Sequence, residues 1–203
     1  MSENRFADKV LLLTGAARRI GAAIVTRLHA EAARIASQYR GSPSEAEALA
    51  AGLNASRADS AAPFRADLLD VQALPLLVDS VVAWGGRLDA LVNNASTFYP
   101  TPVGEITEDH WQDLVGSNFK APLFLSQAAA PHLRKARGGI VNIVDIHGQR
   151  PLRDHSLYGP AKAALAMLTK SLAKDLAPDV RVNGVSPGAI MWPETGLSDN
   201  AQQ

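Results

Sequence analysis

The sequence of 203 residues contains no cysteine. This absence excludes disulfide bonds, thiolate metal ligands and a cysteine nucleophile. An excess of charge of one sign is also missing, because 20 basic residues balance 20 acidic residues. Without such an excess, the surface as a whole has no field that attracts nucleic acid or an anionic membrane. We therefore expect neither nucleic acid nor a membrane among the partners.

Long apolar runs are lacking as well. No stretch approaches the roughly 18 apolar residues of a membrane-spanning helix, and residues 1–6 have no apolar core of a secretion signal. Hydrophobic residues nevertheless make up 47% of the chain, which is enough to build a full core. No repeat, charge block or low-complexity linker divides the sequence. We expect a single domain over residues 1–203, located in the cytoplasm.

Short apolar segments alternate with longer segments of helical periodicity, which predicts strands alternating with helices. This alternation implies parallel pairing with right-handed crossovers, so the sequence predicts an α/β fold with a single doubly wound, Rossmann-like parallel sheet. The predicted strands are 10–13, 34–39, 63–66, 90–93, 139–144 and 181–185, and the predicted helices are 20–31, 44–56, 71–84, 108–133 and 157–176.

A glycine-containing turn, Thr14–Gly21 (TGAARRIG), directly follows the first predicted strand and opens the first predicted helix. Backbone amides and the positive end of the helix dipole converge at such a turn, which makes a site for a dinucleotide pyrophosphate. A glycine turn after a buried strand can also be purely structural. The order of strand, turn and helix favours the nucleotide site.

The end of the second predicted strand indicates which dinucleotide binds. Enzymes that use NAD usually have a carboxylate there, which accepts hydrogen bonds from the ribose 2′-hydroxyl. This chain has Gln38–Ser42 (QYRGS) instead. Arg40, together with Arg18 or Arg19 and the Ser42 hydroxyl, can form charge-assisted bonds to a 2′-phosphate. These arginines could also be ordinary surface charges, but no acid lies among them, so we predict NADPH.

The pentapeptide Tyr158–Lys162 (YGPAK) places a phenol and an ammonium four residues apart at the start of a helical segment. Both side chains then lie on one helix face, and a nearby positive charge favours the phenolate. We predict that Tyr158 exchanges a proton closer to neutral pH than free tyrosine does. Alone the pattern is weak, since an aromatic residue beside a solvated lysine looks the same. Asn93, Asn94 and Asp145 end two other predicted strands, at the edge of the sheet where ligands bind.

Together these elements resemble the short-chain dehydrogenase/reductase family, from about Lys9 to Pro193. Within that family the chain is most similar to the pteridine reductases. It has Arg19 where most members carry a glycine, Asp145 where most carry the catalytic serine, and the segment Asn94–Pro102 where pteridine reductases supply a serine and a phenylalanine to the pterin.

The resemblance implies roles for particular residues. Tyr158 would donate a proton, Lys162 would bind the nicotinamide ribose, and Asn118 would hold a water molecule that links the lysine to solvent. The catalytic residues would be Asn118, Asp145, Tyr158 and Lys162, and the substrate would contact Arg19, Ser96, Phe98, Asp145 and Tyr158. The cofactor would contact Gly15, Arg18, Arg19, Ile20, Gly21, Tyr39, Arg40, Ser42, Asp67, Leu68, Asn94, Ala95, Ser96, Tyr158, Lys162, Pro187, Gly188 and Ile190.

Three of these residues have plausible structural roles too. Asp67 occupies the position where the family holds the adenine, but it could equally cap the helix that begins near Asp70. Asp145 could merely cap a strand, and Phe98 could be buried packing instead of a surface that stacks on a pterin. If Asp145 lies at the site, it opposes the ionisation of Tyr158.

The identity of residue 145 indicates the substrate. A serine donates a hydrogen bond to a carbonyl oxygen, which an ionised carboxylate cannot do. A carboxylate can instead accept from the N–H groups of a pterin or, when protonated, donate to a ring nitrogen. We therefore predict an NADPH-dependent reductase of pterins or dihydropterins, or of dihydrofolate. A reductase of ketones or sugar-like alcohols and a catalytically silent NADPH-binding module are the alternatives.

Three further expectations concern partners, metals and the sheet edge. In the family, the helices matching 108–133 and 157–176 pair across a two-fold axis, so we expect a homodimer or homotetramer. His147, Asp154 and His155 fit no metal motif, so we expect no metal. Family members continue past Gln203 through another helix and strand, so we expect a sheet that lacks or does not show its last strand.

Overall fold

The computed structural model of the chain describes residues 4–188 and 190. Its strands form one parallel sheet of six strands in the order β3-β2-β1-β4-β5-β6. This topology confirms the predicted doubly wound sheet. The strands are β1 (Val10–Leu13), β2 (Arg34–Tyr39), β3 (Ala61–Arg65), β4 (Ala90–Asn93), β5 (Gly139–Ile143) and β6 (Arg181–Val185).

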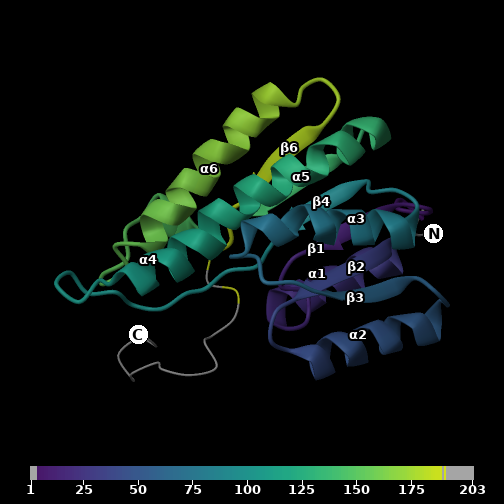
Figure 1. Cartoon of the computed structure of the whole chain (residues 1–203), viewed down its shortest axis with the longest axis horizontal. Helices are drawn as coiled ribbons and strands as arrows, with labels where there is room; N and C mark the ends of the chain where they lie inside the picture. Colours follow the sequence, from purple (N-terminus) through teal and green to yellow (C-terminus); the bar gives the residue numbers. More distant parts are fainter. Residues whose placement is uncertain (1–3, 189, 191–203) are drawn as a thin grey trace.

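Helices cover both faces of the sheet (Figure 1). On one face α1 and α2 bury apolar side chains against β1, β2 and β3. On the other face α3, α5 and the end of α6 pack against β1, β4 and β5. The helices are α1 (Arg19–Ala30), α2 (Pro43–Ser56), α3 (Leu74–Gly85), α4 (Glu108–Val115), α5 (Ala121–Ala136) and α6 (Tyr158–Asp175). Among the described residues, no helix has the length and apolarity needed to cross a bilayer.

Strand β1 lies at the centre of the sheet and is buried on both faces. Leu11 and Leu13 belong to the core beneath α1, whereas Val10 and Leu12 belong to the core beneath α3 and α5. Successive side chains of a strand point to opposite faces, so a central parallel strand must be apolar at every position. This requirement explains the uninterrupted Val-Leu-Leu-Leu run.

The predicted helix 108–133 is three elements. Helix α4 is followed by a π-helical turn, Gly116–Lys120, and then by α5. The turn carries Ser117 and the fully buried Asn118. Such turns are rare and frequently occur at functional sites. The predicted helix 71–84 also divides, because a short 3₁₀ turn, Val71–Ala73, precedes α3.

Candidate functional site

The glycine turn between β1 and α1 lies at the point where the strand order reverses, between β1 and β4. Parallel sheets bind ligands beyond the carboxyl ends of their strands at such a point. Gly15 has a φ of +62°, and a Cβ there would lie 2.9 Å from the Cα of Ala95. A Cβ at Gly21 would lie 2.2 Å from the carbonyl oxygen of Gly15. Both positions therefore require glycine, because a side chain would collide with neighbouring segments of the protein.

Two polar side chains hold this turn in place. The buried Gln38 accepts a hydrogen bond from the Gly15 N–H at 3.0 Å, and its amide donates to the Ala66 carbonyl at 2.7 Å. The Thr14 hydroxyl accepts from the Asn94 N–H at 2.9 Å. Sequence reasoning missed the role of Gln38. The available signal was a polar amide near the end of a predicted strand, Arg34–Tyr39, whose four central residues are buried.

Arg19, the first residue of α1, has a φ of +53°. A residue with a side chain pays roughly 1–2 kcal/mol for this left-handed conformation, which glycine adopts freely. Strained positions of this kind cluster at functional sites. Because Arg19 also lines the cleft, its backbone agrees with the expectation that the side chain serves a ligand.

A cleft of about 500 Å³ extends from the glycine turn along the carboxyl edge of the sheet. It joins most of the residues that the sequence assigns to the cofactor: Gly15, Arg18, Arg19, Ile20, Gly21, Tyr39, Arg40, Ser42, Asp67, Leu68, Asn94, Ala95 and Ser96. Tyr158, Lys162, Pro187, Gly188 and Ile190 are not part of its lining. The lining residues that sequence reasoning missed are Ala17, Gln38, Gly41, Leu69, Thr97 and Ser117.

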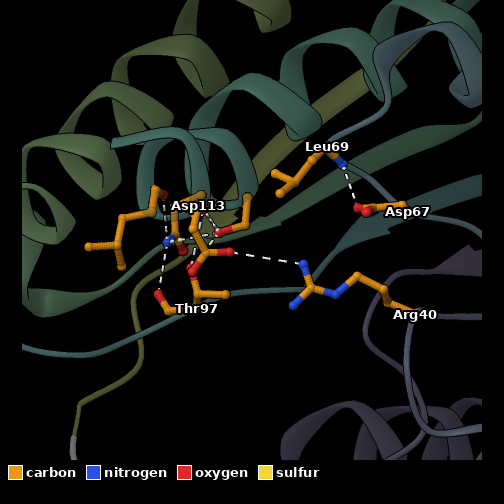
Figure 2. Close-up of polar contacts among 8 residues, drawn as sticks. Arg40, Asp67, Leu69, Thr97 and Asp113 are labelled. Atoms are coloured by element: carbon orange, nitrogen blue, oxygen red, sulfur yellow. Dashed lines mark hydrogen bonds and ion pairs between the residues drawn. The ribbon is translucent and has the colours of Figure 1, made fainter. Parts of the chain in front are cut away.

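The outer end of the cleft carries Arg40 and Ser42, the residues expected to bind a 2′-phosphate. Figure 2 shows Arg40 pointing toward Asp113 of α4, with 3.9 Å between Nη1 and Oδ1. The Asp67 carboxylate accepts from the Leu69 N–H at 3.0 Å (Figure 2). Asp70, not Asp67, caps the following 3₁₀ turn. Asp67 lines the cleft, and its contact with the adenine stays a prediction.

Outside the lining, next to Ser96, the Tyr158 hydroxyl donates a hydrogen bond of 2.6 Å to Oδ2 of Asp145. The other oxygen of Asp145 accepts from the His147 N–H at 2.8 Å and so caps a 3₁₀ turn, Ile146–Gly148. The carboxylate therefore performs the structural capping role and also contacts the phenol. Both Tyr158 and Lys162 are buried.

The pKa of Tyr158 is raised, chiefly by burial and further by the hydrogen bond and charge of Asp145, while Ser96 opposes the rise. The expectation that Tyr158 ionises nearer neutral pH is therefore wrong for this structure. Lys162 Nζ donates to the Ile143 carbonyl at 2.9 Å and lies 5.7 Å from the centre of the Tyr158 ring. The opposition of Asp145 to ionisation of the phenol is confirmed. Tyr158 keeps its proton, which is the form that a proton donor needs.

Burial lowers the pKa of Lys162 to about 8, against the partly compensating charge of Asp145. Between about 8 and 10.5 the unfolded state binds more protons at this lysine, so folding stability should rise with pH there. Above about pH 10 the raised pKa of Tyr158 has the opposite effect, because the folded state then keeps the phenolic proton.

Replacing Lys162 by Met should remove the rise in stability between pH 8 and 10, a change on the order of 3 kcal/mol. Urea unfolding of the wild type and the variant across this range measures the difference. Lys170→Met is the matched control, since Lys170 is an exposed residue of the same helix. An identical pH slope in the wild type and Lys162→Met would contradict the assigned shift.

Asn118 joins the loop after β4 to the π-helical turn. Its amide donates to the carbonyls of Thr97 and Leu114, both at 2.9 Å. Its Oδ1 accepts from the Ser96 hydroxyl at 2.6 Å. Asn118 and Ser96 therefore fix one another beside Tyr158, and the water link from Asn118 to Lys162 stays a prediction.

Phe98 lies beside the phenol of Tyr158. Its ring stacks on His155 with centroids 4.7 Å apart, and it meets the Tyr158 ring edge-on at 4.8 Å. Phe98 remains 49% exposed, so it is not merely buried packing and retains free surface for a ligand. His155 was expected to be only a polar loop residue, but its ring covers one face of the Phe98 ring. In the part of the chain that the structure describes, no cluster of His, Asp and Glu could hold a metal ion.

The segment after β6 approaches the same edge. The Pro187 carbonyl accepts from the Ile146 N–H at 3.2 Å, next to Asp145. Gly188 follows, and Ile190 is exposed. Ala189 and Met191–Pro193 of the segment expected over the nicotinamide lie outside the described residues.

Comparison with known proteins supplies independent evidence of the family to which the chain belongs. A family model described as short chain dehydrogenase matches residues 9–202. Pteridine reductase 1 of Leishmania tarentolae is 40% identical over 224 residues, covering 91% of this chain and 78% of that protein. A 3-oxoacyl-acyl-carrier-protein reductase of Staphylococcus aureus is 34% identical, covering 96% and 80%. A probable galactose dehydrogenase of Rhizobium meliloti is 35% identical, covering 91% and 72%.

Proposed function

The chain belongs to the short-chain dehydrogenase/reductase family and is an oxidoreductase for a nicotinamide cofactor, and we propose that it reduces pterins or dihydropterins with NADPH. Dihydrofolate belongs to the same proposed substrate class. The observation that carries the proposal is the 2.6 Å hydrogen bond from Tyr158 to Asp145, because it puts a carboxylate beside the proton donor.

The cleft fits a dinucleotide. Gly15 and Gly21 leave no room for side chains at the turn, and the backbone amides at the start of α1 can bind a pyrophosphate. Arg40 and Ser42 would bind a 2′-phosphate, which favours NADPH over NADH. The cofactor supplies a hydride. Lys162 would bind the nicotinamide ribose beside Tyr158.

The side chains around Tyr158 offer the groups that reduction of a C=N bond needs. The nitrogen of that bond must gain a proton, and Tyr158 holds one because burial and Asp145 raise its pKa. Asp145 can accept hydrogen bonds from N–H groups of the heterocycle. The exposed part of the Phe98 ring can stack on a flat substrate. These three groups favour a planar nitrogen heterocycle.

A reductase of ketones or sugar-like alcohols is the second candidate. Two relatives have names that specify an oxoacyl group and galactose. That chemistry usually needs a hydrogen-bond donor to a carbonyl oxygen, and an ionised Asp145 offers none. The catalytically silent NADPH-binding module is less well supported, since Tyr158, Lys162 and Asn118 are all present and buried.

The test is oxidation of NADPH by the purified protein, followed by absorbance. Dihydrobiopterin, dihydrofolate, a panel of ketones and a sugar lactone are offered in parallel, each with NADPH and with NADH. We expect turnover of a dihydropterin with NADPH and little turnover of ketones. Ketone turnover without pterin turnover would establish the second candidate, and tight NADPH binding without any turnover would establish the third.

We also propose a cytoplasmic homodimer or homotetramer that pairs through α4, α5 and α6. Trp111 of α4 and Met167 of α6 are large apolar side chains with exposed fractions of 49% and 61%. Exposed apolar groups on helices that do not need them for their own core favour an interface between copies.

A further inference from the structure

We propose that Asp113 is a specificity-determining residue of the cofactor cleft, because its carboxylate competes with the cofactor's phosphate for Arg40 and so limits the affinity for NADPH. This inference rests on the proposed function, since it assumes that Arg40 binds the 2′-phosphate.

Arg40 lines the cleft, and Asp113 lies beside the lining, four residues before the lining residue Ser117. Arg40 follows β2, in the half of the sheet formed by β1, β2 and β3. Asp113 belongs to α4, which follows β4 in the chain, and β4 lies in the other half of the sheet. Their side chains approach one another, with 3.9 Å between Arg40 Nη1 and Asp113 Oδ1 (Figure 2). The guanidinium that should hold the phosphate therefore has a carboxylate partner already.

Asp113 is held in place by its surroundings. Its backbone carbonyl accepts hydrogen bonds from the hydroxyls of Ser117 and Thr97, at 2.7 and 3.3 Å (Figure 2). One turn further, Gly116 lies against Leu69, where a Cβ would be 2.6 Å from Leu69 Cδ2. The helical segment that carries Asp113 is therefore packed against Leu69. Arg40, whose side chain is 57% exposed, is the partner free to move.

The ion pair is weak enough to be displaced. At 3.9 Å and with exposed fractions of 57% and 29%, it contributes little to stability. A phosphate with nearly two negative charges, bidentate to the guanidinium, competes well against one carboxylate. The carboxylate nevertheless stays within a Debye length of the site, so binding of the phosphate must overcome its attraction for Arg40. NADH carries no 2′-phosphate and does not need Arg40 in this way.

Asp113→Asn removes the charge and keeps the shape and a hydrogen-bond acceptor. We expect the Kd for NADPH to fall by about threefold to tenfold at low salt, while the Kd for NADH changes by less than about twofold. In roughly 0.5 M salt the gain should largely disappear, because screening weakens an exposed pair. Fluorescence titration of the full chain with each nucleotide measures these constants.

Two further variants separate competition from other causes. Asp109→Asn removes the same charge from an exposed position one turn earlier on α4, and we expect no change in its Kd for NADPH. Arg40→Gln should weaken NADPH binding, and adding Asp113→Asn to it should give less than about a twofold gain. A double-mutant cycle over Arg40 and Asp113 therefore measures the competition directly.

Three results would overturn the proposal: unchanged or weaker NADPH binding in Asp113→Asn, an equal gain for NADH, or an undiminished gain in the Arg40→Gln background. Failure of the proposed function gives a different result. A wild-type protein that binds NADPH and reduces no pterin contradicts the pterin assignment, yet the Kd comparisons still decide the role of Asp113.

Discussion

Tyr158→Phe is expected to lower kcat for pterin reduction by about a thousandfold, within the range that a general acid supplies. The substitution keeps the buried ring and its contact with Phe98, and it removes only the O–H that donates to Asp145. Because burial and Asp145 raise the pKa of this phenol, the hydroxyl is the protonated group best placed to give its proton to the substrate. Steady-state kinetics with saturating NADPH measure the loss.

Binding of the cofactor provides the control for this variant. Tyr158 lies outside the lining of the cleft that holds Arg40 and the glycine turn, so the Kd for NADPH should change by less than about threefold. A large loss of kcat with preserved NADPH affinity identifies a role in the chemical step. A variant with wild-type kcat would show that another group donates the proton.

Strands β1, β2 and β4 could be predicted from sequence because they are buried on both faces along most of their length. Four predicted strands match the structure at both ends, including β1 and β4, and the other two differ by one or two residues. The π-helical turn Gly116–Lys120 could not be predicted. Helical periodicity averages over several turns, and the extra residue in this turn depends on tertiary packing, such as the contact of Gly116 with Leu69.

The location of the site could be predicted because it follows from the topology of the sheet. Parallel strands bring their carboxyl ends to one edge, so Gly15, Asn94 and Asp145 had to converge there. The spacing of four residues between Tyr158 and Lys162 did not fix where the ammonium points. It donates to the Ile143 carbonyl, and burial dominates the pKa of the phenol, which reversed the expected shift.

Contacts between distant segments were also beyond sequence reasoning. The stacking of Phe98 on His155 and the approach of Arg40 to Asp113 each join two loops or helices far apart in the chain. Nothing in the local pattern of either residue indicates its partner. Both contacts involve exposed or half-buried side chains, for which no requirement for burial restricts the residue type.

Asp145→Ser should change the substrate class. The serine hydroxyl can donate to a carbonyl oxygen and can still cap the turn at His147, but it no longer offers a carboxylate to the N–H groups of a pterin. We expect kcat/KM for a dihydropterin to fall by about a hundredfold or more, because unpaired polar groups of the substrate would be buried. Turnover of at least one ketone in the panel should appear.

Asp145→Asn separates the charge of residue 145 from its shape. The amide keeps the size of the side chain and an oxygen that can accept from Tyr158, so a loss of pterin turnover in both variants assigns the effect to the carboxylate. Both variants should also lower the pKa of Tyr158, since Asp145 raises it, and the pH profile of kcat should move to lower pH. Pterin turnover that survives in Asp145→Ser, with no ketone turnover gained, would contradict the carboxylate as the determinant of substrate class. The hydrogen bond between Asp145 and Tyr158 would then serve only to orient the phenol.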